Sequence, residues 1–160
     1  MRFFTKRLYI RDLEYNDYQG YYEIYSNRLI ASRAGVKTLN GLSEARFFVI
    51  SLLSNSSVKI YTVIYEEKII GTISSFYVNK KGIEIGYAIK SEYQRKGFAY
   101  EMLEKFIEII KTNRNLSFVQ AKIDDRNVAS KGLVKKLGFI EVINSFIDEN
   151  EVIKKYRLYL

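Results

Sequence analysis

A short basic segment of the sequence has the composition of a phosphate-binding turn. It lies between a predicted strand and a predicted helix and consists of Gln94, Arg95, Lys96, Gly97, Phe98 and Ala99. Successive backbone N–H groups at such a junction can converge on an anion, and a helix N-terminus adds positive potential. Gly97 permits a close approach that other residues resist. By itself the segment is a weak signal, and a solvated loop before an ordinary helix is the commoner reading, since neither G-x-x-x-x-G-K nor G-x-G-x-x-G occurs.

The chain contains no histidine and no cysteine, which restricts the chemistry that it can perform. These absences exclude Ser-His-Asp and Cys-His nucleophilic pairs, disulfides, and Cys-rich or His-ligated metal sites, so we expect no metal. Proton transfer must come from Asp, Glu, Lys, Tyr, a Ser hydroxyl or water. A reaction that needs only positioning, backbone dipoles and a carboxylate base remains compatible with the sequence.

The net charge is +8, from 26 Lys and Arg residues against 18 Asp and Glu residues. Such a surface favours a polyanionic partner: nucleic acid, an anionic membrane or a phosphate-rich small molecule. No run of about 18 apolar residues occurs, so we expect no membrane span. The N-terminal residues are charged and contain no long apolar stretch. We therefore expect no signal peptide and a cytoplasmic location.

Hydrophobic periodicity predicts the elements that position the basic segment. A strand is predicted at 6–12, two helices follow at 16–26 and 43–54, and three strands follow at 58–65, 69–78 and 82–89. The clearest amphipathic helix comes next, with apolar residues at helical spacing: Ala99, Met102, Leu103, Phe106, Ile109 and Ile110.

The rest of the chain predicts a strand, a helix and a closing hairpin, at 118–123, 128–137, 139–144 and 151–160. Asn127 is placed to cap the helix and Gly138 to end it. The order β-α-α-β-β-β-α-β-α-β-β predicts an α/β fold: one mixed, mostly antiparallel, twisted sheet with helices on both faces. With 160 residues, 48% of them hydrophobic, we expect a single domain over 1–160.

Two stretches resemble motifs of the GNAT superfamily of N-acetyltransferases. EIGYAIKSEYQRKGFAYEML is similar to its acetyl-CoA-binding motif, [Q/R]-x-x-G-x-[G/A], and DDRNVASKGLVKKLGF is similar to its second motif, N-x-x-S followed by K-x-G-F. The resemblance covers nearly the whole chain and implies the GNAT fold. The N-x-x-S form and the opening RLYIRDLEYNDY look most like the branch that acetylates ribosomal-protein N-termini.

The resemblance implies roles for the matching positions. Backbone amides from Gln94 through Ala99 would bind the pyrophosphate of acetyl-CoA. Tyr87, Ala88 and Ile89 would pair with the pantetheine arm like an added strand. One of their N–H groups would polarise the thioester carbonyl and stabilise the oxyanion.

The second motif implies further contacts. Asn127 would hydrogen-bond the pantetheine, Ser130 would lie near the sulfur, and Lys131 and Lys135 could offer charge to the adenosine phosphates. Many members carry a tyrosine at the position of Val134, where it protonates the leaving thiolate, and valine cannot do so. The acid is then Ser130, a tyrosine from elsewhere or a water.

Glu84 is the candidate general base, since the superfamily sometimes places a base in this strand. The amine arrives as ammonium and must lose a proton before it attacks, directly or through water. The alternative is a structural carboxylate that pairs with a neighbouring cation.

The amine acceptor is not readable, and a peptide N-terminus, a polyamine, an antibiotic and a metabolite all remain open. Four tyrosines at helical spacing could line an acceptor pocket, although packing is the more usual role of such a series: Tyr18, Tyr21, Tyr22 and Tyr25. Three acidic residues of the last hairpin could attract a cationic amine, although a solvated loop is the commoner reading: Asp148, Glu149 and Glu151. A homodimer is compatible with the resemblance.

Two alternatives to an enzyme remain. One is a CoA-binding sensor on the same fold that acetylates nothing. The other is a basic nucleic-acid-binding module, which scattered charges and the lack of a known motif disfavour.

Overall fold

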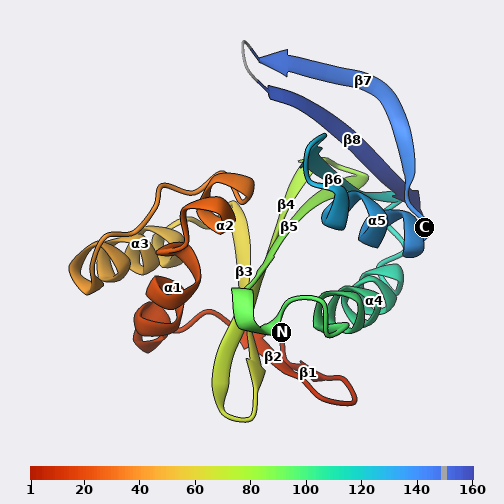
Figure 1. Cartoon of the computed structure of the whole chain (residues 1–160). Coiled ribbons are helices and arrows are strands. Elements are labelled where there is room, and N and C mark those ends of the chain that lie inside the picture. The colour runs from red at the N-terminus through yellow and green to blue at the C-terminus, as the bar shows by residue number, and fades with distance from the viewer. Residues whose placement is uncertain (149–150) are drawn as a thin grey trace.

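The computed structural model describes residues 1–148 and 151–160. Within them the strands form one eight-stranded sheet in the order β1-β2-β3-β4-β5-β6-β8-β7 (Figure 1). Neighbouring strands are antiparallel except β5 and β6, which are parallel. The mixed, mostly antiparallel sheet predicted from the sequence is confirmed. The strands are β1 (Phe3–Phe4), β2 (Tyr9–Asp12), β3 (Val58–Tyr65), β4 (Lys68–Asn79), β5 (Gly82–Ile89), β6 (Phe118–Asp124), β7 (Ile140–Asp148) and β8 (Glu151–Tyr159).

Helices cover both faces of the sheet, as predicted (Figure 1). Helices α1, α2 and α3 lie on one side, and α4 and α5 lie on the other. None of the helices in the described part of the chain is both long and apolar enough to cross a membrane. The bounds are α1 (Tyr18–Tyr25), α2 (Arg28–Arg33), α3 (Leu42–Ser54), α4 (Phe98–Lys111) and α5 (Val128–Lys136).

Two short elements are missing from the prediction. Strand β1 has two residues and pairs with β2, and α2 has six residues. The Oδ1 atom of Asn27 begins α2 by accepting hydrogen bonds from the amides of Leu29 and Ile30, at 3.0 and 3.1 Å. Neither element is long enough for a hydrophobic period to show.

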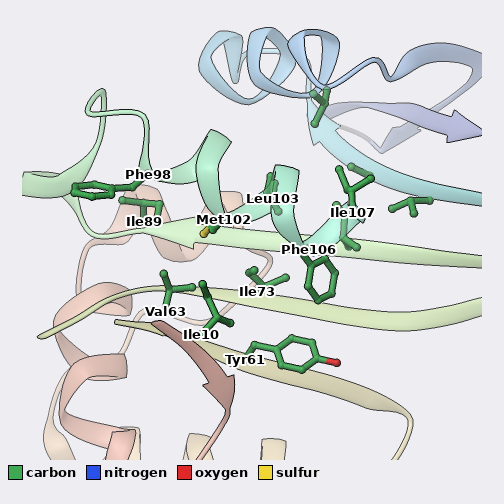
Figure 2. Packing of buried hydrophobic residues seen from close by; sticks show 14 of the residues in the cluster. Ile10, Tyr61, Val63, Ile73, Ile89, Phe98, Met102, Leu103, Phe106 and Ile107 are labelled. Atoms are coloured by element: carbon green, nitrogen blue, oxygen red, sulfur yellow. The ribbon is translucent and has the colours of Figure 1, made fainter. Parts of the chain in front are cut away.

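The larger of two hydrophobic cores lies between α4 and the sheet (Figure 2). Met102, Leu103 and Phe106 of α4 are at most 1% exposed, and the Phe106 ring lies 5.3 Å from the ring of Tyr61 on β3. The amphipathic face predicted for this helix is confirmed, with Ile107 as an additional buried residue. Three residues predicted for it are only partly buried: Ala99, Ile109 and Ile110. The smaller core packs α1 and α3 on the opposite face.

Strands β5 and β6 pair over only three residues each. The register joins 82–84 of β5 to 118–120 of β6. Beyond this point β5 remains paired with β4 as far as Ile89, and β6 remains paired with β8 as far as Asp124. The carboxyl ends of β5 and β6 therefore diverge, and the two facing edges have no strand partner among the described residues. The segments that lead into α4 and α5 follow these two ends.

Replacing Phe106 by alanine should lower the free energy of unfolding by about 3–5 kcal/mol, because the ring is buried between Tyr61 and Phe3 and its removal leaves a cavity. Chemical denaturation measures the change. Phe47 of α3 is 71% exposed, so Phe47→Ala is the matched control and should change stability by less than about 0.5 kcal/mol. Equal losses in the two variants would contradict this packing.

Candidate active site

The turn before α4 has two residues in the left-handed region of backbone conformation. Arg95 has φ 62°, and Gly97, the N-cap of α4, has φ 82° and ψ −2°. Lys96 between them has a negative φ. When successive residues alternate between left-handed and right-handed backbone conformations, their N–H groups point toward one side and form a concave nest for an anion. The nest is followed directly by the N-terminus of a 14-residue helix, which adds positive potential.

The amides of this turn are largely without partners. Among the described residues, none of the N–H groups from Arg95 through Tyr100 donates a hydrogen bond, whereas the Gln94 N–H donates to the Ser91 carbonyl at 3.2 Å. Of the predicted run from Gln94 to Ala99, the Gln94 amide is therefore already occupied. The Gln94 side chain is also occupied, since its Nε2 donates to the Ile89 carbonyl at 2.8 Å and ties the turn to β5.

The open edge of β5 offers backbone groups of alternate residues. The Lys90 N–H donates to the Ile70 carbonyl of β4 at 2.8 Å, and the register places Ala88 opposite Thr72. Since antiparallel strands alternate the direction of their backbone groups, Ala88 directs its N–H toward β4. Tyr87 directs its N–H to the opposite side, where β6 has diverged. The Ile89 carbonyl, which Gln94 reaches, lies on that same side.

Asn127 and Ser130 lie at the first turn of α5, at the end of β6. Asn127 is the helix N-cap, as predicted: its Oδ1 accepts from the Ser130 N–H at 3.2 Å, and its Nδ2 donates to Ser130 Oγ at 3.0 Å. The cap orients the Ser130 side chain. A functional feature that the sequence did not reveal lies beside it. The Tyr87 hydroxyl is buried and has no hydrogen bond of normal geometry within the described residues.

Tyr87 keeps its proton over a wide pH range. Burial raises the pKa of Tyr87 to about 12, although the nearby Ser130 hydroxyl acts in the opposite direction. A buried hydroxyl without a partner is costly, so this hydroxyl is a candidate contact for a bound molecule. The Tyr87 hydroxyl therefore lies near Ser130 without a hydrogen bond of normal geometry between them. Val134 offers no substitute, because it is fully buried in the core on the α4 side.

Glu84 lies at the point where β5 and β6 separate, paired in register with Gln120. Glu84 is buried, with 9% of the residue exposed. Its Oε2 accepts from Gln120 Nε2 at 2.7 Å and lies 3.3 Å from Lys122 Nζ. Arg157 Nη2 donates to Gln120 Oε1 at 3.3 Å, which extends the network. Because side chains alternate along a strand, Glu84 and Tyr87 project from opposite faces of the sheet.

The two lysines of α5 differ in their surroundings. Lys131 Nζ donates to Asp125 Oδ1 at 2.7 Å, so its charge is already paired. Lys135 is exposed, and it remains available to an anion on the surface of α5. Of the two cations that the resemblance implies, Lys135 is the one that the structure leaves free to move.

On the other face, packing accounts for two of the four tyrosines of α1. Tyr21 and Tyr25 are buried, and their hydroxyls hydrogen-bond to Thr62 at 3.4 Å and to Thr72 at 2.8 Å. The other two are partly buried beside the smaller core: Tyr18 and Tyr22. Of the three acidic residues predicted for the last hairpin, Glu149 lies outside the described residues, and Asp148 and Glu151 are described by their backbone alone.

Comparison with known proteins gives the same assignment as the motifs. The family model described as an acetyltransferase (GNAT) domain matches residues 7–140. The uncharacterized N-acetyltransferase YnaD of Bacillus subtilis is 30% identical over 142 residues, which cover 86% of this chain and 82% of YnaD.

Solved structures show the same fold. Spermidine N-acetyltransferase from Vibrio cholerae, in complex with CoA and spermine, has a TM-score of 0.79 and 22% identity over 96% of this chain and 95% of its own. Ribosomal-protein-S5-alanine acetyltransferase from Vibrio fischeri has a TM-score of 0.80 and 19% identity over 99% of this chain and 96% of its own. Since the family model spans most of the sequence and YnaD is similar along nearly all of it, the chain belongs to the GNAT family of acetyltransferases.

Proposed function

We propose that this protein transfers the acetyl group of acetyl-CoA directly to a primary amine in a ternary complex. The observation that carries the proposal is the run of unpartnered amides from Arg95 through Tyr100 at the start of α4. Backbone donors that face an anion at a helix N-terminus need no side-chain chemistry, which suits a chain without histidine or cysteine. The Vibrio cholerae relative, in complex with CoA and spermine, supports a CoA ligand and an amine acceptor.

Acetyl-CoA binds between the diverging ends of β5 and β6. The amides of the turn hold the pyrophosphate, and Lys135 adds charge near the adenosine phosphates. The open edge of β5 pairs with the pantetheine arm as an added strand. Because Tyr87 directs its N–H away from β4, this amide is the donor that polarises the thioester carbonyl and stabilises the oxyanion.

Transfer forms one bond and breaks one. A primary amine is protonated at neutral pH, so it gives up a proton to Glu84, directly or through a water. Its nitrogen then attacks the thioester carbon, and the carbon–sulfur bond breaks. The products are an amide and the CoA thiolate. The attacking nitrogen releases a second proton as the amide forms, and this release balances the proton that the thiolate takes up.

We assign that last proton to Ser130, supported by Tyr87. Ser130 Oγ accepts from Asn127 Nδ2. In the proposed complex the nearby Tyr87 hydroxyl, which has no hydrogen-bond partner in the described part of the chain, donates a second bond to Ser130 Oγ and directs the serine proton toward the sulfur. An alcohol alone is a poor acid, but a hydroxyl that accepts two hydrogen bonds donates more strongly. This pair takes the role that a tyrosine at the position of Val134 has in other family members.

The acceptor class is a primary amine: a peptide N-terminus, a polyamine, an antibiotic or a metabolite. The Vibrio cholerae protein is named for spermidine and the Vibrio fischeri protein for ribosomal protein S5, so proteins of similar fold are named for a polyamine and for a ribosomal protein. We propose a single domain over residues 1–160 that acts in the cytoplasm, as a monomer or a homodimer.

The first test is calorimetry with CoA on the protein and on its Gly97→Ala variant. Alanine at φ 82° costs about 1–2 kcal/mol and displaces the nest, so we expect the affinity to fall about tenfold or more. Gly35 also has a positive φ, of 65°, but lies after α2. Gly35→Ala is the matched control and should lower the stability of the fold without lowering the affinity for CoA.

The same protein is then incubated with acetyl-CoA and a panel of amines, and mass spectrometry detects acetylated products. CoA binding without any product would favour the sensor, and salt-dependent binding of an oligonucleotide without CoA binding would favour the nucleic-acid module. Either result would overturn the proposed activity.

Glu84→Gln should keep the affinity for acetyl-CoA and lower the turnover number, because glutamine accepts no proton. Gln120 can still donate to the new amide oxygen, so the fold is preserved. The comparison of turnover with CoA affinity checks this. An unchanged turnover would leave Glu84 with only the structural role of pairing with Lys122.

Tyr87→Phe should lower turnover about tenfold while leaving stability unchanged or raised, because it removes a buried hydroxyl without a partner. Ser130→Ala should cause a similar loss, and the double variant should be little worse than either single variant, since the two hydroxyls act together. Steady-state kinetics with the acceptor found in the panel measures all three. Full turnover in Tyr87→Phe would exclude its part in protonation.

A further inference from the structure

Arg7, in the segment between β1 and β2, holds the phosphate-binding turn from the side opposite the nest. Its Nη1 donates to the Lys96 carbonyl at 3.1 Å, and its Nε donates to Glu101 Oε2 at 2.6 Å. Its guanidinium carbon lies 4.1 Å from the centre of the Phe98 ring. One side chain therefore contacts three residues of the turn and the first helical turn that follows it.

The bond to the Lys96 carbonyl determines the direction of an amide. The peptide between Lys96 and Gly97 is trans, as all peptides of the described chain are, so its C=O and N–H point in opposite directions. A donor on the carbonyl side fixes the plane of this peptide and aims the Gly97 N–H into the nest. It also polarises the peptide, which strengthens that N–H as a donor.

The bond to Glu101 removes an electrostatic conflict. Glu101 lies in the first turn of α4, where a carboxylate stabilises the helix but repels an anion at the same N-terminus. Burial alone would raise the pKa of Glu101, but hydrogen bonds from Thr5 and Arg7 outweigh it and hold that pKa below its ordinary value. Glu101 is thus a carboxylate at neutral pH, and Arg7 balances its charge.

We propose that Arg7 is a positioning residue for the diphosphate of CoA: it aims the Gly97 amide and neutralises Glu101 behind the nest. The inference rests on the proposed function, since it assumes that the nest binds this diphosphate. Arg7 does not touch the ligand in this arrangement. It acts through the Lys96–Gly97 peptide and through the charge of Glu101.

The test is calorimetry of CoA and dephospho-CoA on the full chain, its Arg7→Ala and Glu101→Gln variants and their double variant. We expect Arg7→Ala to lower the affinity for both ligands by about tenfold. Both ligands contain the diphosphate, and the charge of Glu101, no longer balanced by Arg7, then repels it. Glu101→Gln should stay within about twofold of the parent, and it should restore part of the loss in the double variant.

Lys6→Ala is the matched control. Lys6 is exposed and, among the described residues, bonds to neither Lys96 nor Glu101. Lys6→Ala removes one positive charge beside Arg7. Because exposed charges are screened, its affinity for CoA should stay within about twofold of the parent protein. Thermal unfolding of every variant reports the stability separately from the affinity. Should Arg7→Ala fold poorly, Arg7→Lys replaces it and should show a smaller loss of the same sign.

The outcomes separate the two proposals. If the parent protein binds no CoA, the proposed function fails. If the parent binds CoA and Arg7→Ala binds it equally well, only the role of Arg7 is overturned. Equal losses of CoA affinity in Arg7→Ala and Glu101→Gln would also overturn the role of Arg7. That result is expected if the ion pair only supports the structure, because either substitution breaks it. A loss confined to CoA, absent with dephospho-CoA, would place Arg7 at the adenosine phosphate instead.

Discussion

The brief parallel pairing of β5 with β6 determines where every other part of the candidate site can lie. The two strands share only three register pairs before β5 follows β4 and β6 follows β8. A sheet that stayed paired would satisfy these backbone edges internally and leave no donors for a ligand. Because the strands diverge, the edge of β5 stays open, and the turn before α4 and the start of α5 border the same space. The α4 core holds this geometry rigid by packing Met102, Leu103 and Phe106 against the sheet.

The divergence also divides the chemistry between the two faces of the sheet. Glu84 projects toward the side of α1 and α3, whereas Tyr87 projects toward the side of α4 and α5. In the proposed mechanism the base Glu84 is therefore separated by the sheet from the hydroxyls that protonate the thiolate. The proposed mechanism needs only a carboxylate, two hydroxyls and backbone amides, and it does not use the imidazole or thiolate that the sequence lacks.

Much of this architecture is readable from the sequence, because the elements that form the sheet and α4 have clear periods. The motif around Gly97 and the cap at Asn127 are readable because they depend on local residue types. The left-handed conformation of Arg95 cannot be predicted, since a non-glycine residue gives no sign of it in the sequence.

The contact of Arg7 with Glu101 joins residues 94 positions apart, so no local pattern predicts it. The orphan hydroxyl of Tyr87 likewise follows from tertiary packing, not from a motif. The role of Glu84 is undetermined by sequence, because a buried strand carboxylate has the same pattern in either role.

The nest places few demands on the types of residue that form it. Its donors are main-chain N–H groups, which every residue except proline carries, and the whole chain contains no proline. A codon change at Lys96 therefore alters local charge and leaves the donor itself in place. Gly97 has less freedom, because its left-handed backbone disfavours a side chain. Chains that bind an anion in such a nest can therefore differ widely in the residues around the glycine, and a similar backbone conformation can persist after sequence similarity is lost.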